Sequence, residues 1–372
     1  MKKKLNKNSL NGFINYGIVI AAFAALQVLM GTGRLSNTLQ SLLVPACCYI
    51  VMAVSLNLTV GILGELSLGH AGFMSLGAFS GITASILLQS AIPMAPLRLA
   101  VSMAVGAAFG ALGGAIVGVP VLRLQGDYLA IVTLAFGQII KNIIMVLYVG
   151  VDSRGIHFAA SSKRFDLAPD GTAIIKGPMG AVGVAKLASF TAGFVLILIT
   201  LLVVQNLVNS RSGRAIMALR DNRIAAESVG INVTKYKLMA FVTSAALAGA
   251  AGALWGLNYS STVASKFNFN TSILVLVFVV LGGLGSIRGS IIAAALLYVL
   301  PELLRGLGLD DYRMLIYAIV LILVMLATNN ERFTALMGRV GGWFEAAGKR
   351  ILGWLKSLGR TQSKGKGGTT NG

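Results

Sequence analysis

Charged residues are scarce in this chain of 372 residues. Only 12% of the residues are Asp, Glu, Lys or Arg, whereas 56% are hydrophobic and the mean hydropathy is +0.81. Soluble domains have about 25% charged residues, so the composition excludes that class and indicates a polytopic membrane protein. The formal net charge of +19 does not indicate nucleic-acid binding, because the basic residues lie in loops and tails rather than on one folded polar face.

Cysteine and histidine are also rare, with two of each. Cys47 and Cys48 are adjacent within an apolar run, which excludes a disulfide framework and favours buried thiols. Two histidines exclude a His-rich metal site, and the HExxH and GxSxG motifs are absent. The segment GKGGTT has Gly367 where a phosphate loop needs Ser or Thr after its lysine. We therefore expect no catalytic residue, no metal ion and no nucleotide site in this chain.

Long apolar runs dominate the chain. A membrane-spanning helix needs about 20 apolar residues, and this measure gives ten candidate spans at 14–30, 38–60, 64–88, 97–119, 128–149, 187–208, 238–258, 271–283, 289–304 and 313–328. The eighth and ninth are short and separated by LGGLGSIRGS. Merging them would place the basic C-terminal tail outside the cell, so we count two. The expected fold class is an all-α polytopic membrane protein with about ten transmembrane helices, some of them short or broken.

The basic residues predict the orientation of these spans. Loops rich in Lys and Arg stay on the cytoplasmic side, and a cytoplasmic N-terminus puts about twice as many basic residues inside as outside. The resulting divisions are a cytoplasmic N-terminus 1–13, a transmembrane region 14–328 with an extracytoplasmic loop 150–186 and a cytoplasmic loop 209–237, and a basic cytoplasmic tail 329–372. We expect the extracytoplasmic segment to be a solvated loop, long enough to dock a soluble partner.

Glycine is abundant, with 45 residues. In the fourth and seventh spans it recurs every four residues, which lets a neighbouring helix approach closely. We expect these glycines to pack helices together: Gly106, Gly110, Gly114, Gly118, Gly252 and Gly256. The glycines from Gly61 to Gly81 follow no single period and have polar residues between them, which favours broken or unwound helix beside a transport pathway.

Polar residues within the spans are the candidates for that pathway, because charged and polar groups in a membrane usually face protein or water. Glu65 is read either as an interfacial carboxylate that caps the third span or as a pathway residue. His70 is either a packing histidine or a pathway contact, and Lys141 could instead extend its ammonium to the membrane surface. The full candidate set is Glu65, Ser67, His70, Gln138, Lys141 and Asn142.

The cytoplasmic loop 209–237 interrupts the apolar sequence with six Lys and Arg residues. Its middle, from Ile224 to Asn232, predicts one short helix that ends at Gly230. The loop has no catalytic motif, so it suits a docking surface better than a site of chemistry. The simpler interpretation is a basic loop that only fixes the orientation of the chain.

Four segments carry a resemblance to a known family: Ser55–Phe79, Arg123–Ile140, Ser210–Leu254 and Val280–Leu304. Over most of residues 50–328 the chain resembles the permease subunits of bacterial branched-chain amino acid ABC importers, of the LivM-like type. The third segment is the most specific, because these permeases share a cytoplasmic loop in which a short helix of acidic and small residues is followed by glycine.

The resemblance implies an ABC importer permease fold in the bacterial inner membrane, with both termini cytoplasmic. Two cytoplasmic ATPase subunits would bind ATP and Mg, and they would hold the cytoplasmic loop 209–237, which would couple ATP hydrolysis to transport. A second homologous permease, or a second copy of this chain, would complete the pathway, and an extracytoplasmic binding protein would deliver the amino acid. The coupling residues implied in this way are Arg214, Arg220, Ala225, Ala226, Glu227, Gly230 and Asn232.

Three alternatives remain open from the sequence. A ribose-type sugar or nucleoside permease would share the loop and the GGLGS-like segment. A secondary carrier would work without ATPase subunits, and the genes next to its own would then not encode them. A membrane scaffold would need no pathway, and substrate-stimulated ATP hydrolysis by a reconstituted complex would exclude it.

Overall fold

The computed structural model describes residues 7–32, 36–122, 124, 126–152, 154–162, 165, 167–168, 171–306, 315, 318–319 and 322. The chain divides into two compact units. One contains Met1–Ile18 and Asp310–Gly372, and the other contains Val19–Leu309. In the first unit the described residues are the start of helix α1 (Lys7–Gly31) and four single positions. The expected span 313–328, apart from those four positions, and the tail 329–372 lie outside the described residues.

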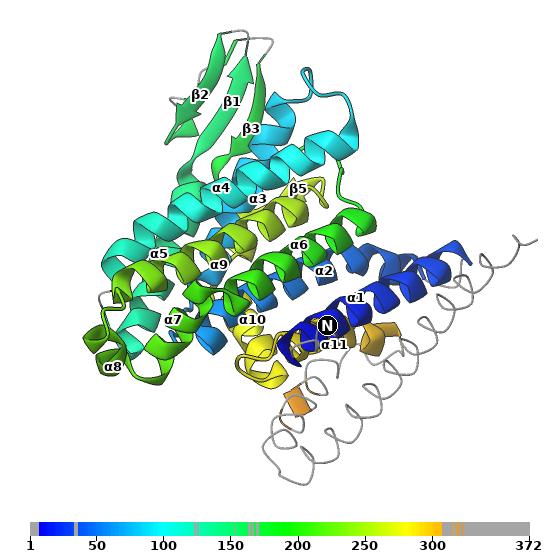
Figure 1. Ribbon diagram of the computed structural model, residues 1–372. Coiled ribbons are helices and arrows are strands. Elements are labelled where there is room, and N and C mark those ends of the chain that lie inside the picture. Colours follow the sequence, from blue (N-terminus) through cyan, green and yellow to red (C-terminus); the bar gives the residue numbers. More distant parts are fainter. Residues whose placement is uncertain are drawn as a thin grey trace, which may run out of the picture. The chain divides into compact units, whose positions relative to one another are not determined.

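The second unit is a bundle of helices with a small sheet (Figure 1). The helices after α1 are α2 (Asn37–Asn57), α3 (His70–Leu87), α4 (Ala95–Val121), α5 (Asp127–Val146), α6 (Phe190–Asn209), α7 (Arg211–Asp221), α8 (Arg223–Ser228), α9 (Val233–Gly256), α10 (Phe269–Gly282) and α11 (Ile287–Gly306). A π-helical turn, η1 (Leu58–Ile62), follows α2, and two 3-10 turns are η3 (Gly177–Met179) and η4 (Ala264–Lys266). The strands are β1 (Tyr148–Asp152), β2 (Gly155–Ala159), β3 (Thr172–Lys176), β4 (Ala181–Val182) and β5 (Ser261–Thr262).

Six helical segments in the described part are long and apolar enough to cross a membrane: Leu39–Ile62, His70–Leu87, Ala95–Val121, Tyr128–Val146, Phe190–Asn209 and Val233–Gly256. Helices α1, α10 and α11 contain shorter apolar stretches. The chain is therefore a helical, multi-pass membrane protein. Residues 271–304, which the sequence left ambiguous, form two helices, because Gly283 and Gly285 have φ angles of +89° and +81°, and glycine adopts such angles without steric cost.

Small residues bring α3, α4 and α9 into close contact at the centre of the unit. Four of the five glycines of α4, those spaced four residues apart, face α9, and a Cβ atom at Gly110 would lie 2.5 Å from the carbonyl oxygen of Ala245. On the other side of α9, a Cβ atom at Gly252 would overlap the backbone of Met74 in α3. Larger side chains at these positions would separate the helices, so the glycine spacing determines which helix faces meet.

A five-stranded antiparallel sheet with the order β2-β1-β3-β4-β5 occupies much of the segment that the sequence predicted to be a solvated loop. That prediction was wrong, and the all-α fold class omitted this sheet. β1 pairs with β2 in the register Val149↔Phe158. The strands have two to five residues each, rich in the aromatic and β-branched types that favour strands. A search for runs of about 20 apolar residues does not detect such short elements.

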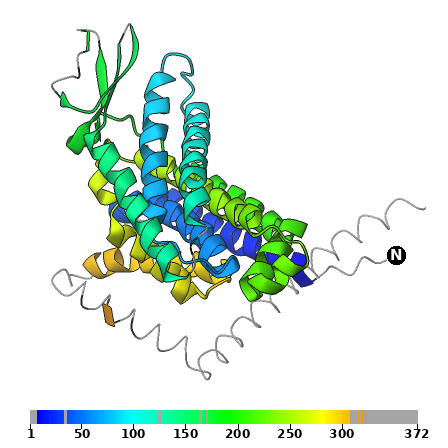
Figure 2. The same cartoon turned by 90° about the vertical axis from the view of Figure 1, so that its left-hand side faces the viewer.

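We call residues 209–237 the polar loop. The sheet and the polar loop lie at opposite ends of α6 and α9. Strand β4 precedes the start of α6 and β5 follows the end of α9, whereas α7 and α8 connect the end of α6 to the start of α9. Figures 1 and 2 show this separation. We call the two regions the sheet end and the loop end.

Candidate functional site

The polar loop at the loop end contains two helices rather than one. Side chains that accept hydrogen bonds from backbone amides cap each of them: Ser210 Oγ accepts from Gly213 N (3.1 Å) at α7, and Asn222 Oδ1 accepts from Ala225 N (3.0 Å) at α8. Such caps satisfy amides that a helix start leaves unpaired. The predicted helix from Ile224 to Asn232 was too long, because α8 ends at Ser228 and Asn232 caps the next helix, α9.

A small core holds α7, α8 and the start of α9 together. Leu219, Ala226 and Val233 are buried, one from each of these three helices, and Ile231 and Tyr236 pack against them. Gly230 makes the sharp turn between α8 and α9 with a φ angle of +84°, a conformation that costs other L-residues about 1–2 kcal/mol. The loop therefore has a defined shape.

The tip of this loop exposes apolar side chains. Ile224 is 80% exposed and Val229 is 75% exposed, at the two ends of α8. Ala225 and Glu227 are also exposed, and Arg223 Nε donates to Glu227 Oε1 over 3.3 Å. Aliphatic groups left in water at a rigid, polar-rimmed tip are typical of a protein interaction site.

The chain between α2 and α3 is not a continuous helix. The helix α2 passes into η1 and ends, and α3 begins at His70. The predicted third span from residue 64 was wrong at its start, because Gly64 has a φ angle of +81° that breaks the helix. The sequence did anticipate broken helix in this glycine-rich region. We call residues 58–69 the broken segment.

The broken segment is anchored to α10 and α11 through their connecting turn. Asn57 Oδ1 accepts a hydrogen bond from Gly285 N over 2.8 Å. The backbones meet so closely that a Cβ atom at Gly61 would overlap Gly285. Irregular backbone within a membrane survives where protein surrounds it, and residues Leu58, Thr59, Gly61 and Ile62 are all buried.

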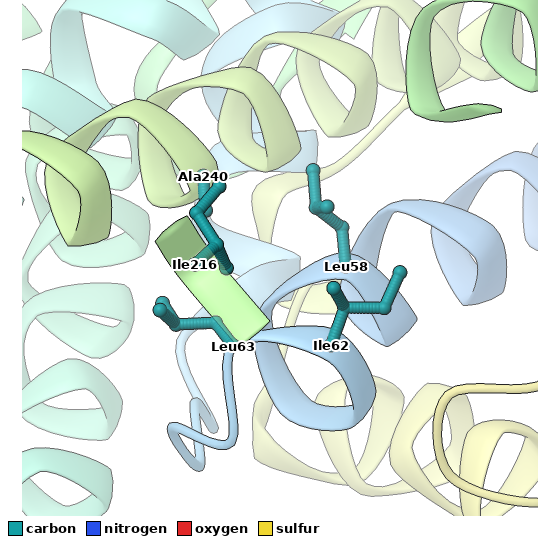
Figure 3. Packing of buried hydrophobic residues seen from close by; sticks show 5 residues of the cluster. All are labelled: Leu58, Ile62, Leu63, Ile216 and Ala240. Carbon is teal, nitrogen blue, oxygen red and sulfur yellow. The ribbon is translucent and has the colours of Figure 1, made fainter. Parts of the chain in front are cut away.

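The broken segment also packs against the polar loop. Leu58, Ile62 and Leu63 form one buried cluster with Ile216 of α7 and Ala240 of α9 (Figure 3). Helix α7 is thus fixed to the broken segment by apolar contact, and α8 is fixed to α7 by the small core described above. The exposed tip is therefore connected to this cluster through α7.

Two basic residues of the polar loop bind the broken segment. Arg220 Nη1 donates to the carbonyl oxygen of Gly61 over 3.2 Å, and the other guanidinium nitrogens bind Asp221 Oδ1 at 2.9 and 3.0 Å. Lys237 forms an ion pair with Glu65, and their side chains are only 5% and 14% exposed. Glu65 does not cap α3, whose first residue follows Gly69. The sequence treated Lys237 only as a basic residue that fixes orientation, so its partner was missed.

Two further candidates lie in or beside the broken segment and are buried. His70 is 2% exposed, and its Nε2 atom lies 2.8 Å from Ser55 Oγ. This hydrogen bond joins α2 to the start of α3. Ser67 is 1% exposed, and its hydroxyl has no hydrogen-bond partner among the described residues.

The remaining pathway candidates lie on α5. Thr133 Oγ1 accepts from the amide of Leu68 over 3.1 Å, and Gly137 meets Gly69 closely, so α5 borders the broken segment. Gln138 and Lys141 are partly buried and Asn142 is exposed. The candidates in or beside the broken segment (Glu65, Ser67 and His70) and the candidates on α5 thus lie on adjacent elements. Across the described residues, no three His, Cys, Asp or Glu side chains are grouped as a metal site.

The fold and the site define a class, a multi-pass helical membrane protein with a polar loop of defined shape. The chain belongs to the family described as branched-chain amino acid transport system / permease component, whose model matches residues 38–325. It is 34% identical over 296 residues to the high-affinity branched-chain amino acid transport system permease protein LivM of Escherichia coli K12, and 33% identical over 296 residues to LivM of Salmonella typhimurium.

These alignments cover 75% of this chain and 66% of each LivM relative, so the chain spans slightly less than two thirds of their length. The ribose import permease protein RbsC of Escherichia coli K12 is 28% identical over 304 residues, which cover 80% of this chain and 87% of that relative. No solved structure matches.

Proposed function

We propose that this chain is the transmembrane permease subunit of an ATP-binding cassette importer in the bacterial inner membrane, and that it forms part of the pathway for branched-chain amino acids. The family membership and the LivM relatives support the substrate class. The exposed apolar tip of α8 on a rigid support is the observation that carries the mechanism, because such a tip suits a cleft on a cytoplasmic partner.

In this proposal two ATPase subunits bind the tips of two permeases and supply the energy, with ATP and Mg bound on the ATPases. The loop end then faces the cytoplasm and the sheet end faces outward, which agrees with the basic character of residues 209–237. A homologous permease or a second copy completes the pathway, and a soluble binding protein delivers the amino acid at the sheet end. The ABC importer fold with ten spans and cytoplasmic termini belongs to the same proposal.

In this proposal the contacts described above form the route from the ATPase to the pathway. Movement of α8 passes to α7 and α9 through their shared core, and from there to the broken segment through Arg220, Lys237 and the cluster of Figure 3. The broken segment leads into α3 and touches α5, where the pathway candidates lie. A ribose-type permease is the second candidate function, favoured by the match to RbsC over 87% of that protein.

The ATPase contact is tested by replacing the exposed apolar residues of the tip. Ile224→Asp and Val229→Asp place a charge where an apolar contact forms, so co-purification of the ATPase subunits should fall by about tenfold or more, which corresponds to about 1.4 kcal/mol. The matched control is Ile156→Asp, an aliphatic residue that is 46% exposed at the sheet end and whose replacement should leave ATPase binding unchanged. Equal ATPase recovery for all three variants would refute the assignment of the tip.

A further inference from the structure

A pocket of about 750 Å³ lies at the sheet end, between the outer part of the α3–α4 hairpin and the sheet. Its walls include Gln89 after α3, Arg98 in the first turns of α4, Ile174 and Lys176 of β3, and Val182 of β4. This volume falls within the range of small-molecule pockets and is therefore large enough to admit a protein side chain. The loop end and the candidate pathway residues contribute nothing to it.

The lining of the pocket contains a buried cation, one of whose donor atoms has no partner among the described residues. Arg98 is only 8% exposed, and its Nε atom is buried without a hydrogen-bond partner among the described residues. Lys176 adds a second positive charge, and no Asp or Glu is among the described residues of the lining. Burying a charge without a partner is costly, and the guanidinium fork of arginine is suited to a carboxylate, which it binds through two parallel hydrogen bonds.

We propose that this pocket receives an acidic side chain, Asp or Glu, of the soluble binding protein that docks at the sheet end. The inference rests on the proposed function, because that function supplies an extracytoplasmic protein partner. A free amino acid fits the pocket less well, since its ammonium group finds no carboxylate among the described lining residues. An anionic lipid also fits less well, because polar side chains such as Gln89 and Thr172 interrupt the apolar wall that acyl chains need.

Binding of the purified cognate binding protein to the assembled transporter in lipid nanodiscs tests this assignment. Arg98→Gln should raise the Kd about tenfold or more, because truncating one member of a desolvated charge pair leaves the other unpaired. Lys176→Gln should raise the Kd less, and Arg98→Lys should be intermediate because it keeps the charge but loses the fork. Lys266→Gln, an exposed lysine at the same end but outside the pocket lining, is the matched control for loss of one charge.

The partner group is identified by combining Arg98→Lys with single Asp→Asn and Glu→Gln changes in the binding protein. One acidic position should show non-additive losses with Arg98→Lys, and this coupling supports the proposal. Uniform additivity, or Kd values for the pocket variants equal to that of Lys266→Gln, overturns it. If Arg98→Gln does not fold, Arg98→Lys and Lys176→Gln decide the question in the same way.

Two further outcomes are distinguishable. In the first, Arg98 variants lose phosphatidylglycerol that the wild type retains, but their Kd for the binding protein is that of the wild type in nanodiscs with and without this lipid. This result shows that the pocket holds a lipid headgroup, and it overturns the inference. Failure of the wild-type transporter to bind any cognate binding protein contradicts the proposed function itself. Normal wild-type binding with unaffected pocket variants removes only the pocket assignment.

Discussion

The ion pair between Lys237 and Glu65 joins the polar loop to the broken segment, and most of both side chains is buried. Removing one partner of such a pair leaves a buried charge and costs about 3–5 kcal/mol. Glu65→Gln and Lys237→Met should each lower the thermal stability of the permease in detergent. The double variant should lose less than the sum of the single losses, because neither charge then remains unpaired.

The exposed pair Arg223–Glu227 is the matched control for this ion pair. Its side chains are 38% and 48% exposed, and exposed pairs contribute about 0–1 kcal/mol. Glu227→Gln should therefore leave the melting temperature nearly unchanged. Additive losses in the Glu65 and Lys237 double variant would show that the two charges do not interact in the folded protein.

Asp152 holds the turn between β1 and β2. Its burial alone would raise the pKa of the carboxyl, but the amides of Ala168 and Arg154 and the ring of His157 favour the charged form, and the pKa falls below its ordinary value of 3.8. The charged carboxylate thus stabilises the sheet above the unfolded pKa, and this stabilisation is lost as the pH falls through the folded pKa.

Acid should therefore loosen the sheet below about pH 4, and Asp152→Asn should loosen it already at neutral pH. Hydrogen exchange of the peptides that contain β1 and β2, corrected for the intrinsic exchange rate, measures both effects. Asp221→Asn, which changes an exposed carboxylate at the loop end, should leave the exchange of these peptides unaltered. Protection that stays constant between pH 7 and pH 3 would exclude this role for Asp152.

At the scale of helices, the glycine face of α4 determines how closely α9 approaches. A Cβ atom at Gly114 would lie 2.5 Å from the Cβ atom of Ala245, so Gly110→Leu together with Gly114→Leu would force α4 and α9 apart. Overpacking typically costs about 1–3 kcal/mol for each site. The double variant should give low yield and early aggregation in size-exclusion chromatography.

Gly17→Leu is the control for this prediction, because the space around Gly17 is open for a Cβ atom. Its yield should match that of the wild type. A stable, monodisperse Gly110 and Gly114 double variant would contradict close packing of α4 on α9 and would favour contact of this face with lipid.

The elements that the sequence predicted well are those whose signal is local and repeated. The apolar runs of α2, α4, α6 and α9 and the glycine spacing of α4 are visible in the residues themselves, since membrane helices need length and apolar character. The helix break near Gly64 could also be inferred, because the glycines there follow no helical period. Short strands such as β1 and β3 carry too few residues to stand out from a loop.

Long-range contacts of the candidate site could not be predicted from the sequence. The pair Lys237–Glu65 joins residues 172 positions apart, and the hydrogen bond from Arg220 to Gly61 spans 159 positions. Neither partner has a sequence feature that selects the other. Helix α7 was missed because the prediction considered only the middle of the loop, although Ser210 and the buried pair Ile216 and Leu219 match a capped amphipathic helix.

At the scale of the unit Val19–Leu309, the proposed function uses two ends joined by the same helices. The loop end has an apolar tip with defined support, and the sheet end has a cationic pocket, while α6 and α9 run from one to the other. The broken segment packs against the polar loop at the loop end and leads into α3, with α5 and the turn before α11 beside it. An importer needs such an arrangement, because energy enters on one side of the membrane and the substrate enters on the other.

The identity of the substrate separates the two candidate functions. Proteoliposomes that contain the complete transporter should accumulate leucine, isoleucine or valine only with ATP inside the compartment that corresponds to the cytoplasm, and ribose should not compete. Thermal-shift screening of the binding protein against amino acids, amides and sugars should show the same preference. A site that pairs the ammonium and carboxylate groups of an amino acid leaves its own buried polar groups without partners when ribose binds, so discrimination should exceed about 1000-fold. Uptake of ribose, or accumulation driven by an ion gradient without ATP, would instead establish the sugar permease or the secondary carrier.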